Sequence, residues 1–369
     1  MKNQHDFPYD VLENILSRLP VKSLLRLKTV CKSWNAMIKD PGFAGTHSKQ
    51  SKLSNSQRFF VGYSCGEKTY SWMKFKGHEF YMESVGLFQS EEYKYAYYLC
   101  GCEGILLFED IYRETRERKF VLLNPFTRNY STFSCPFYDE ILDNRICFCG
   151  WYGLCFDKYE DDYKFVAVLR GGRYLVYSVK NDSWIERQSE LRGYVCFRGT
   201  YVNGVVYWIM SDCLSFFSPG EIVYFDPKDD LLKQLRGPED LKNVNFELTN
   251  LRGNLCLYTI HEKSVIRIFL LKEHEHEHGG RKRWMKLMTA DYNLEPPEDD
   301  LSKLFLPCRP LYLTSENEVV FQNPWSMTYA VYRPEKQKFG EIKKLPFDTV
   351  MIGSSCLESL HFPAIRREW

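Results

Sequence analysis

The sequence lacks the features that mark membrane and secreted proteins. It has no uninterrupted apolar run of about 18 residues, the length that a membrane-spanning helix needs. Its start, MKNQHDFPYD, contains no apolar stretch of the kind found in a secretory signal. We therefore expect no membrane partner, and we interpret the 13 cysteines as reduced core thiols of a cytoplasmic or nuclear protein.

The chain also lacks a strong net charge, because 49 Lys and Arg residues balance 48 Asp and Glu residues. Nucleic-acid-binding domains usually carry a clear basic excess, so we expect no nucleic acid partner. The charge is uneven, since residues 1–52 have a net charge of +5, which leaves −4 for the rest. We interpret the positive end as a solvated helix surface that suits an acidic protein partner.

Catalytic signatures are missing as well. We find no Gly-rich phosphate loop, no Gly-x-Ser-x-Gly elbow and no Cys-x-x-Cys pair. The pairs Cys100-x-Cys102 and Cys147-x-Cys149 are spaced too closely for a typical structural zinc site. The His-Glu run 274–278 contains His-Glu-x-x-His, but its charged flanks give a helix no apolar face to bury. We predict a solvated loop there, with weak adventitious metal binding as the alternative, and no catalytic, metal-binding or cofactor-binding residues.

What the sequence does contain is a dense supply of apolar and aromatic residues. Hydrophobic residues make up 44% of the chain, aromatic residues 16% and charged residues 26%. The balance is that of a globular protein rather than a disordered one, and the aromatic content favours a fold rich in β-strands.

Residues 7–47 show helical periodicity. The spacing i, i+1, i+4, i+5, i+8 predicts one apolar helix face formed by Val11, Leu12, Ile15, Leu16 and Leu19. Pro20 should end this helix because it has no N–H to donate. A short second helix carries Leu24 and Leu27, and a third covers about residues 30–38 before the Asp-Pro-Gly stop at residues 40–42. A helical unit of about 40 residues buries little apolar surface alone, so we expect it to meet another protein or, alternatively, to cap a larger domain.

This stretch closely resembles the F-box found at the N-terminus of many plant F-box proteins. The resemblance is carried by Phe7-Pro8, Ile15-Leu16, residues 19–24, residues 30–34, Asp40-Pro41, Phe43 and His47, with Phe7 where leucine is common. It implies that the chain binds a Skp-type adaptor and, through it, a cullin in an SCF ubiquitin ligase. The implied adaptor-binding residues are Phe7, Pro8, Leu12, Ile15, Leu16, Leu19, Pro20, Val21 and Leu24.

An internal repeat follows a polar connector, which we place at residues 48–57. Apolar strands followed by polar tight turns recur around Asn124, Val176, Asp226 and Val331. Glycines that open a strand recur too, with 100 positions from Gly104 to Gly204 and 49 from there to Gly253. A period of about 50 residues with four strands per copy is typical of kelch-type propeller blades. The repeat predicts six blades, near residues 58–90, 97–134, 147–187, 194–236, 246–288 and 308–343, and the alternatives are a β-sandwich or two stacked β domains.

The region from about residue 95 to 345 resembles the kelch-like F-box-associated domain of plant F-box proteins. The matching pieces are residues 101–106, 124–128, 153–157, 161–164, 201–204 and 207–208. The predicted fold is therefore mainly β with a small N-terminal α unit: a three-helix F-box at residues 1–47 and a six-bladed propeller at 58–369.

The combined resemblance implies a non-catalytic substrate receptor that holds a target protein near a ubiquitin-conjugating enzyme. Alternatives are a propeller-based enzyme acting on a small molecule, and a binding module that uses the adaptor without a cullin. Because binding residues gather on loops held by a rigid scaffold, we expect the target on the propeller face with the longer loops. The candidate residues there are Tyr112, Arg113, Arg116, Phe216, Phe217, Trp325 and Met327.

Overall fold

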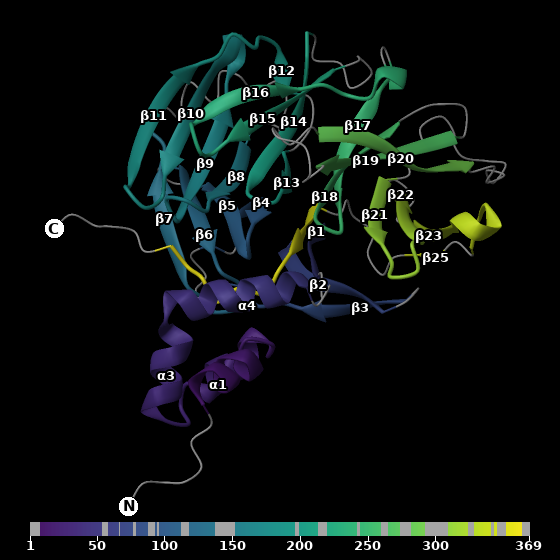
Figure 1. Cartoon of the computed structure of the whole chain (residues 1–369). Helices are drawn as coiled ribbons and strands as arrows, with labels where there is room; N and C mark the ends of the chain where they lie inside the picture. The colour runs from purple at the N-terminus through teal and green to yellow at the C-terminus, as the bar shows by residue number, and fades with distance from the viewer. Residues whose placement is uncertain are drawn as a thin grey trace, which may run out of the picture.

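The computed structural model shows four short helices followed by six β-sheets (Figure 1). It describes residues 8–53, 58–65, 67–76, 79–87, 93, 96–111, 118–136, 152–195, 199–212, 220–241, 244–259, 265–273, 282–291, 309–323, 328–340, 343–344 and 352–363. The predicted mainly-β architecture with a six-bladed propeller is confirmed.

The helical unit, residues 8–53, contains one more helix than the sequence predicted. Its helices are α1 (Tyr9–Leu16), α2 (Val21–Leu27), α3 (Lys32–Lys39) and α4 (Pro41–Leu53). Pro41 ends α3 as expected, but it also occupies the first position of α4, where proline is tolerated because its missing N–H needs no partner. The expected connector at 48–57 is corrected accordingly, since residues 48–53 belong to α4.

The six sheets follow the predicted repeat. Five of them, the second to the sixth, consist of strands that are consecutive in the chain. The second sheet contains β4 (Tyr97–Cys102), β5 (Ile105–Ile111), β6 (Arg118–Leu123) and β7 (Tyr130–Ser134), and the third contains β8 (Tyr152–Asp157), β9 (Asp162–Val168), β10 (Arg173–Ser178) and β11 (Ser183–Gln188). The fourth contains β12 (Tyr194–Val195), β13 (Thr200–Val202), β14 (Val205–Ser211), β15 (Glu221–Asp226) and β16 (Leu231–Leu235); the fifth contains β17 (Phe246–Leu251), β18 (Asn254–Thr259), β19 (Val265–Glu273) and β20 (Lys282–Asp291); and the sixth contains β21 (Arg309–Leu313), β22 (Val319–Asn323), β23 (Thr328–Arg333), β24 (Lys338–Phe339) and β25 (Lys343–Lys344). Neighbouring strands in these sheets pair antiparallel.

The remaining sheet joins the two ends of the propeller. Its strands are β1 (Arg58–Cys65), β2 (Glu67–Lys76), β3 (Glu79–Ser84) and β26 (Ile352–Cys356), in the order β26-β1-β2-β3. Phe60 pairs with Ser354 across the β1–β26 ladder. The strand from the C-terminal region thus completes the first blade, a contribution that the sequence repeat did not predict.

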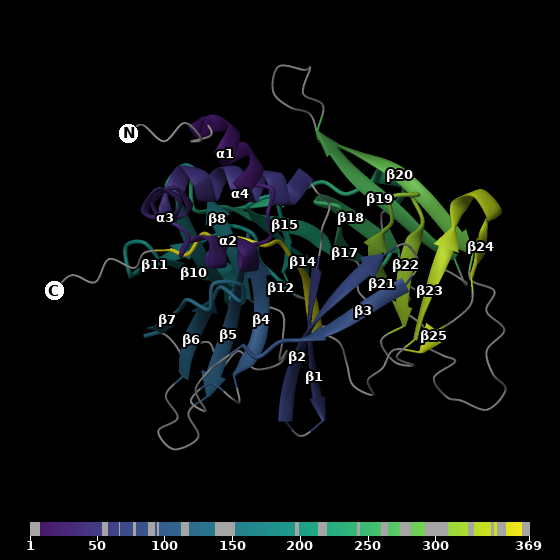
Figure 2. The same cartoon turned by 90° about the horizontal axis from the view of Figure 1, so that it is seen from below.

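The sheets are arranged as blades around a central axis (Figure 2). The first strands of successive sheets lie next to one another, as β26 contacts β4, β4 contacts β8, and β17 contacts β21. Each pair of neighbouring sheets shares an apolar core; Phe120, Phe133 and Phe165, for example, lie between the second and third sheets. Central strands such as β9, β14 and β22 are therefore buried on both faces.

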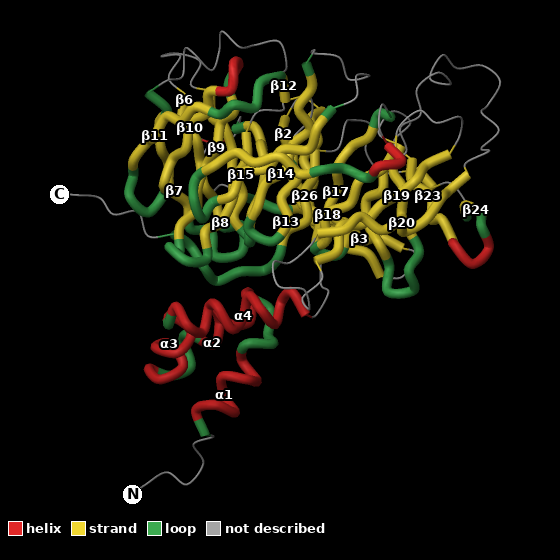
Figure 3. Tube along the Cα trace, turned by 45° about the horizontal axis from the view of Figure 1, so that its top comes forward, coloured by secondary structure: helices red, strands yellow, loops and turns green. Residues whose placement is uncertain are grey.

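We call the two faces of the propeller the turn face and the loop face. The turn face carries the turns that join β4 to β5, β6 to β7, β8 to β9, β10 to β11, β13 to β14, β15 to β16, β17 to β18, β21 to β22 and β23 to β24. Left-handed residues recur in its turns, among them Arg128, Asp182, Asp230 and Gln337 in the later turn of four sheets. The helical unit lies on one side of the propeller (Figure 3), and its contacts, described below, are with turn-face residues.

Candidate functional site

The helical unit buries one apolar cluster and leaves a second apolar surface uncovered. Its core consists of Leu16, Leu24, Met37, Ile38 and Phe43. Outside this core, Tyr9 is 58% exposed, Val11 44%, Ile15 50% and Val30 60%. We call these four residues the exposed apolar surface. Four large apolar side chains left exposed on so small a unit are candidate contacts for another protein.

The predicted adaptor-binding residues divide into supporting and available side chains. Leu16, Val21 and Leu24 are buried within the protein, so they shape the unit from inside. Leu12 and Leu19 are half-buried against its core.

The available side chains are the prolines that precede the first two helices and one residue near the end of α1. Pro8 and Pro20 are exposed just before α1 and α2, and Ile15 is exposed on α1. Phe7 lies outside the described residues. The adaptor-binding role of all of these residues stays a prediction.

The turn between α1 and α2 is held by α4 and by the C-terminal region. His47 on α4 donates from Nε2 to the Leu19 carbonyl at 3.0 Å, while its Nδ1 has no hydrogen-bond partner among the described residues. Burial lowers the pKa of His47, and the backbone hydrogen bond and nearby Glu358 oppose that shift. The imidazole is therefore neutral at pH 7, with its proton on Nε2.

A polar hub on the turn face connects α4 to the propeller. Glu103 Oε1 accepts from Lys52 Nζ of α4 at 2.7 Å and from the Tyr201 hydroxyl at 2.6 Å. Burial raises the pKa of Tyr201 well above its ordinary value, so the phenol keeps the proton that it donates. Tyr201 in turn accepts from the Gly204 N–H, and Asn250 donates to its carbonyl. The hub ties α4 to the inner strands of several blades.

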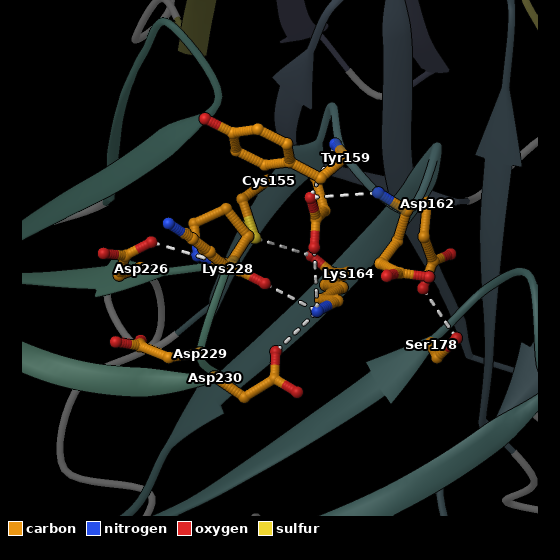
Figure 4. Close-up of polar contacts among 12 residues, drawn as sticks. Cys155, Tyr159, Asp162, Lys164, Ser178, Asp226, Lys228, Asp229 and Asp230 are labelled. Carbon is orange, nitrogen blue, oxygen red and sulfur yellow. Dashed lines mark hydrogen bonds and ion pairs between the residues drawn. The ribbon is translucent and has the colours of Figure 1, made fainter.

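A second polar cluster on this face joins the third and fourth sheets (Figure 4). Lys164 Nζ donates to Asp230 Oδ1 at 2.7 Å, to the Pro227 carbonyl at 2.6 Å and to Asp157 Oδ2 at 3.3 Å. Burial opposes the charge, but Asp230 and Asp157 raise the pKa of Lys164 above its ordinary value. A lysine with three acceptors is a structural clamp between blades rather than a general base.

The predicted target-binding residues all lie outside the described residues. They are Tyr112, Arg113, Arg116, Phe216, Phe217, Trp325 and Met327. Their flanking strands are described, and each stretch connects the second and third strands of its sheet, on the loop face. Target docking at that face stays a prediction.

Neither a metal site nor a membrane span is found in the part of the chain that the structure describes. Within that part, no group of three or more His, Cys, Asp and Glu residues is placed to hold a metal ion. No helix there is long and apolar enough to cross a bilayer. The His-Glu run 274–278 lies outside the described residues. Cys102, Cys155, Cys256 and Cys356 are buried free thiols.

Comparison with known proteins agrees with this two-part structure. The F-box domain model matches residues 5–44, and the model of the F-box associated beta propeller domain matches residues 54–343. Helical unit and six-bladed propeller thus define an F-box protein with a propeller. More particularly, the chain belongs to the family whose propeller is the F-box associated domain.

The matched relatives are plant proteins. An F-box/kelch-repeat protein of Arabidopsis thaliana is 27% identical over 314 residues, which cover 78% of this chain and 80% of the relative. An F-box protein of the same plant is 25% identical over 284 residues, covering 70% and 75%. Over 38 residues, 10% of either chain, identity to a putative F-box/kelch-repeat protein of that plant rises to 63%.

Solved structures give only remote matches. A chain of a nidogen/laminin complex has a TM-score of 0.45 at 10% identity, covering 82% of this chain and 99% of that one. A streptogramin B lyase has a TM-score of 0.40 at 12% identity, covering 82% and 91%. Scores this low support no argument about function.

Proposed function

We propose that this protein is the target-recognition subunit of an SCF-type ubiquitin ligase. It binds a Skp-type adaptor through its helical unit, reaches a cullin through that adaptor, and captures a target protein with its propeller. The observation that carries the proposal is the exposed apolar surface of Tyr9, Val11, Ile15 and Val30 on a unit that matches the F-box model.

The charge of the helical unit supports the choice of partner. Arg18, Lys22, Arg26, Lys32 and Lys39 are all exposed on it. Apolar anchors surrounded by cations favour a partner whose docking surface is apolar in the centre and acidic around it. An adaptor of that kind would be steered to the unit by charge and held by the apolar contacts.

The proposed mechanism is proximity and needs no reacting side chain in this chain. A target held at one side of a rigid propeller keeps its lysines at high effective concentration near the conjugating enzyme. We place this work in the cytoplasm or nucleus, where the buried thiols would stay reduced.

Co-purification tests the proposal. The full chain, expressed with a Skp-type adaptor and a cullin, should form a complex that contains all three proteins. A stable complex with the adaptor that never recruits the cullin would favour the non-degradative binding module instead. Failure to bind any Skp-type adaptor would refute the proposal.

A further inference from the structure

The segment that follows β26, residues 357–363, lies between the helical unit and the turn face. Successive side chains contact opposite partners. Leu360 and one carboxylate oxygen of Glu358 meet the helical unit, whereas Ser359 and His361 meet the propeller. The other oxygen of Glu358 pairs with Arg58 of β1. This alternation is what an extended chain shows when both of its sides are covered.

On the helical side, Glu358 contacts the start of α2. The Val21 N–H donates to Glu358 Oε2 at 2.8 Å, and Arg58 of β1 forms an ion pair with Glu358 Oε1. Glu358 is only 9% exposed, so both contacts lie in a poorly hydrated place where charge-assisted hydrogen bonds are strong. Two residues further on, Leu360 packs against the core of the helical unit.

On the propeller side, Asn124 anchors the backbone of the segment. Its Nδ2 donates to the Ser359 carbonyl at 2.9 Å and to the His361 carbonyl at 2.8 Å. Asn124 is fully buried, and its Oδ1 is occupied by the N–H groups of Phe126 and Thr127. The asparagine is therefore locked in the orientation that holds the segment.

Close packing fixes the same stretch. A Cβ at Gly104 would lie 2.5 Å from Ser359 Cβ, and the φ of +87° at Gly104 also requires glycine. The ring of His361 stacks on Tyr163 with centroids 5.7 Å apart, and Phe362 packs on the core between the second and third sheets. The propeller therefore contacts Ser359, His361 and Phe362, while Glu358 and Leu360 contact the helical unit.

We propose that residues 357–363 form a latch that positions the helical unit on the propeller. Because the latch continues directly from β26, the order of the helical unit depends on closure of the propeller ring. The helical unit has a small core of its own, and contacts from the latch supply part of what it lacks. Glu358 and Leu360 are its positioning residues. The inference concerns the free chain and stands whether or not the adaptor assignment holds.

Hydrogen exchange of the full chain, without any partner, tests the latch. We compare wild type with the double variant Glu358→Ala/Leu360→Ser and with a matched control, Glu335→Ala/Leu231→Ser, at exposed propeller positions. Loss of a charge-assisted hydrogen bond should speed amide exchange of α1 and α2 by about tenfold or more. Amide exchange in β4–β7 should be unchanged. Small-angle scattering should show a larger maximum dimension, because the helical unit moves away from the propeller.

Two results would overturn the proposal. One is unchanged exchange of α1 and α2 in the double variant. The other is an increase spread evenly over helical unit and propeller, which would make the segment a part of the propeller core alone. If the double variant does not fold, the single variant Leu360→Ala, which removes the apolar contact with the helical unit and keeps the ion pair of Glu358 with Arg58, decides between the same outcomes.

Discussion

Ile15 is the residue that most directly tests adaptor binding. Half of its surface is exposed, so a charge can be introduced there without opening the core. If it anchors the interface, Ile15→Glu should weaken adaptor binding by about 30-fold or more, the usual cost of a central anchor. The melting temperature should stay near that of wild type. Titration calorimetry with the purified adaptor measures the effect.

The matched control is Ile185→Glu, at a residue that is 38% exposed on the outer strand β11. It introduces the same charge on the propeller and should leave adaptor affinity unchanged. Equal affinity of the Ile15 variant and wild type would mean that the adaptor uses another surface. The pair Leu19 and Pro20 is less suitable, because Leu19 also packs on the core of the helical unit.

His47 makes the stability of the helical unit depend on pH. Burial lowers its pKa in the folded protein, so the unfolded chain takes up a proton first as the pH falls. The stabilisation is complete above the ordinary histidine pKa, about 6.5, and is lost as the pH falls below it. Burial also lowers the pKa of His361, although the charges of Asp161 and Glu103 oppose that shift.

His47→Gln isolates that contribution, because a glutamine amide can still donate to the Leu19 carbonyl. As the pH falls from about 7.5 to 5.5, the protection factors of amides in α1 and α4, which correct for the intrinsic pH dependence of exchange, should drop more in wild type than in the variant. Parallel pH curves for the two proteins would mean that His47 has the same pKa in the folded and unfolded states, which would contradict the prediction.

At the scale of elements, buried charges lie where β9 of one blade meets the β15–β16 turn of the next. Lys164→Met should destabilise the protein by about 3 kcal/mol, because Asp157 and Asp230 would lose their buried partner. Lys158→Met, at an exposed residue of the turn between β8 and β9, should change stability by less than about 0.5 kcal/mol. Urea denaturation of both variants makes the comparison, and equal midpoints would contradict the clamp.

The elements that the sequence predicted are those with strong periodicity. Strands such as β14 and β18 follow glycine turns and are apolar along most of their length, so their repeat was visible. α4 was missed because Pro41-Gly42 reads as a stop and the residues after it are polar. β26 was missed because its sequence, Ile-Gly-Ser-Ser-Cys, has no apolar alternation and gains its place only by pairing with β1.

The site was less predictable than the fold. The apolar periodicity of α1 located the surface, but it could not tell Ile15, which is exposed, from Leu16, which is buried. That division depends on how α1 packs against the later helices. Glu358 carried no local signal at all, since its partners Val21 and Arg58 are some 300 residues away.

At the scale of the whole molecule, closure by β26 should make the protein sensitive to loss of its last strand. Removing residues 352–369 takes away both β26 and the latch, so propeller and helical unit should lose protection together. Removing only 364–369, which lies beyond the described residues, is the control and should leave both intact. Limited proteolysis followed by mass spectrometry distinguishes them, and a stable propeller without β26 would refute the prediction.

The pairing of β1 with β26 also sets an order of events during synthesis. β1 leaves the ribosome about 290 residues before its inner partner, and contacts so distant in sequence form slowly. Until β26 is synthesised, β1 has an unpaired edge. The Val21 N–H of α2 also lacks its acceptor, the Glu358 carboxylate. The helical unit is synthesised first and therefore reaches its final structure last. In a chain whose translation stops early, the helical unit should remain incompletely ordered. Such a chain, which lacks a complete propeller, would then not bind the adaptor.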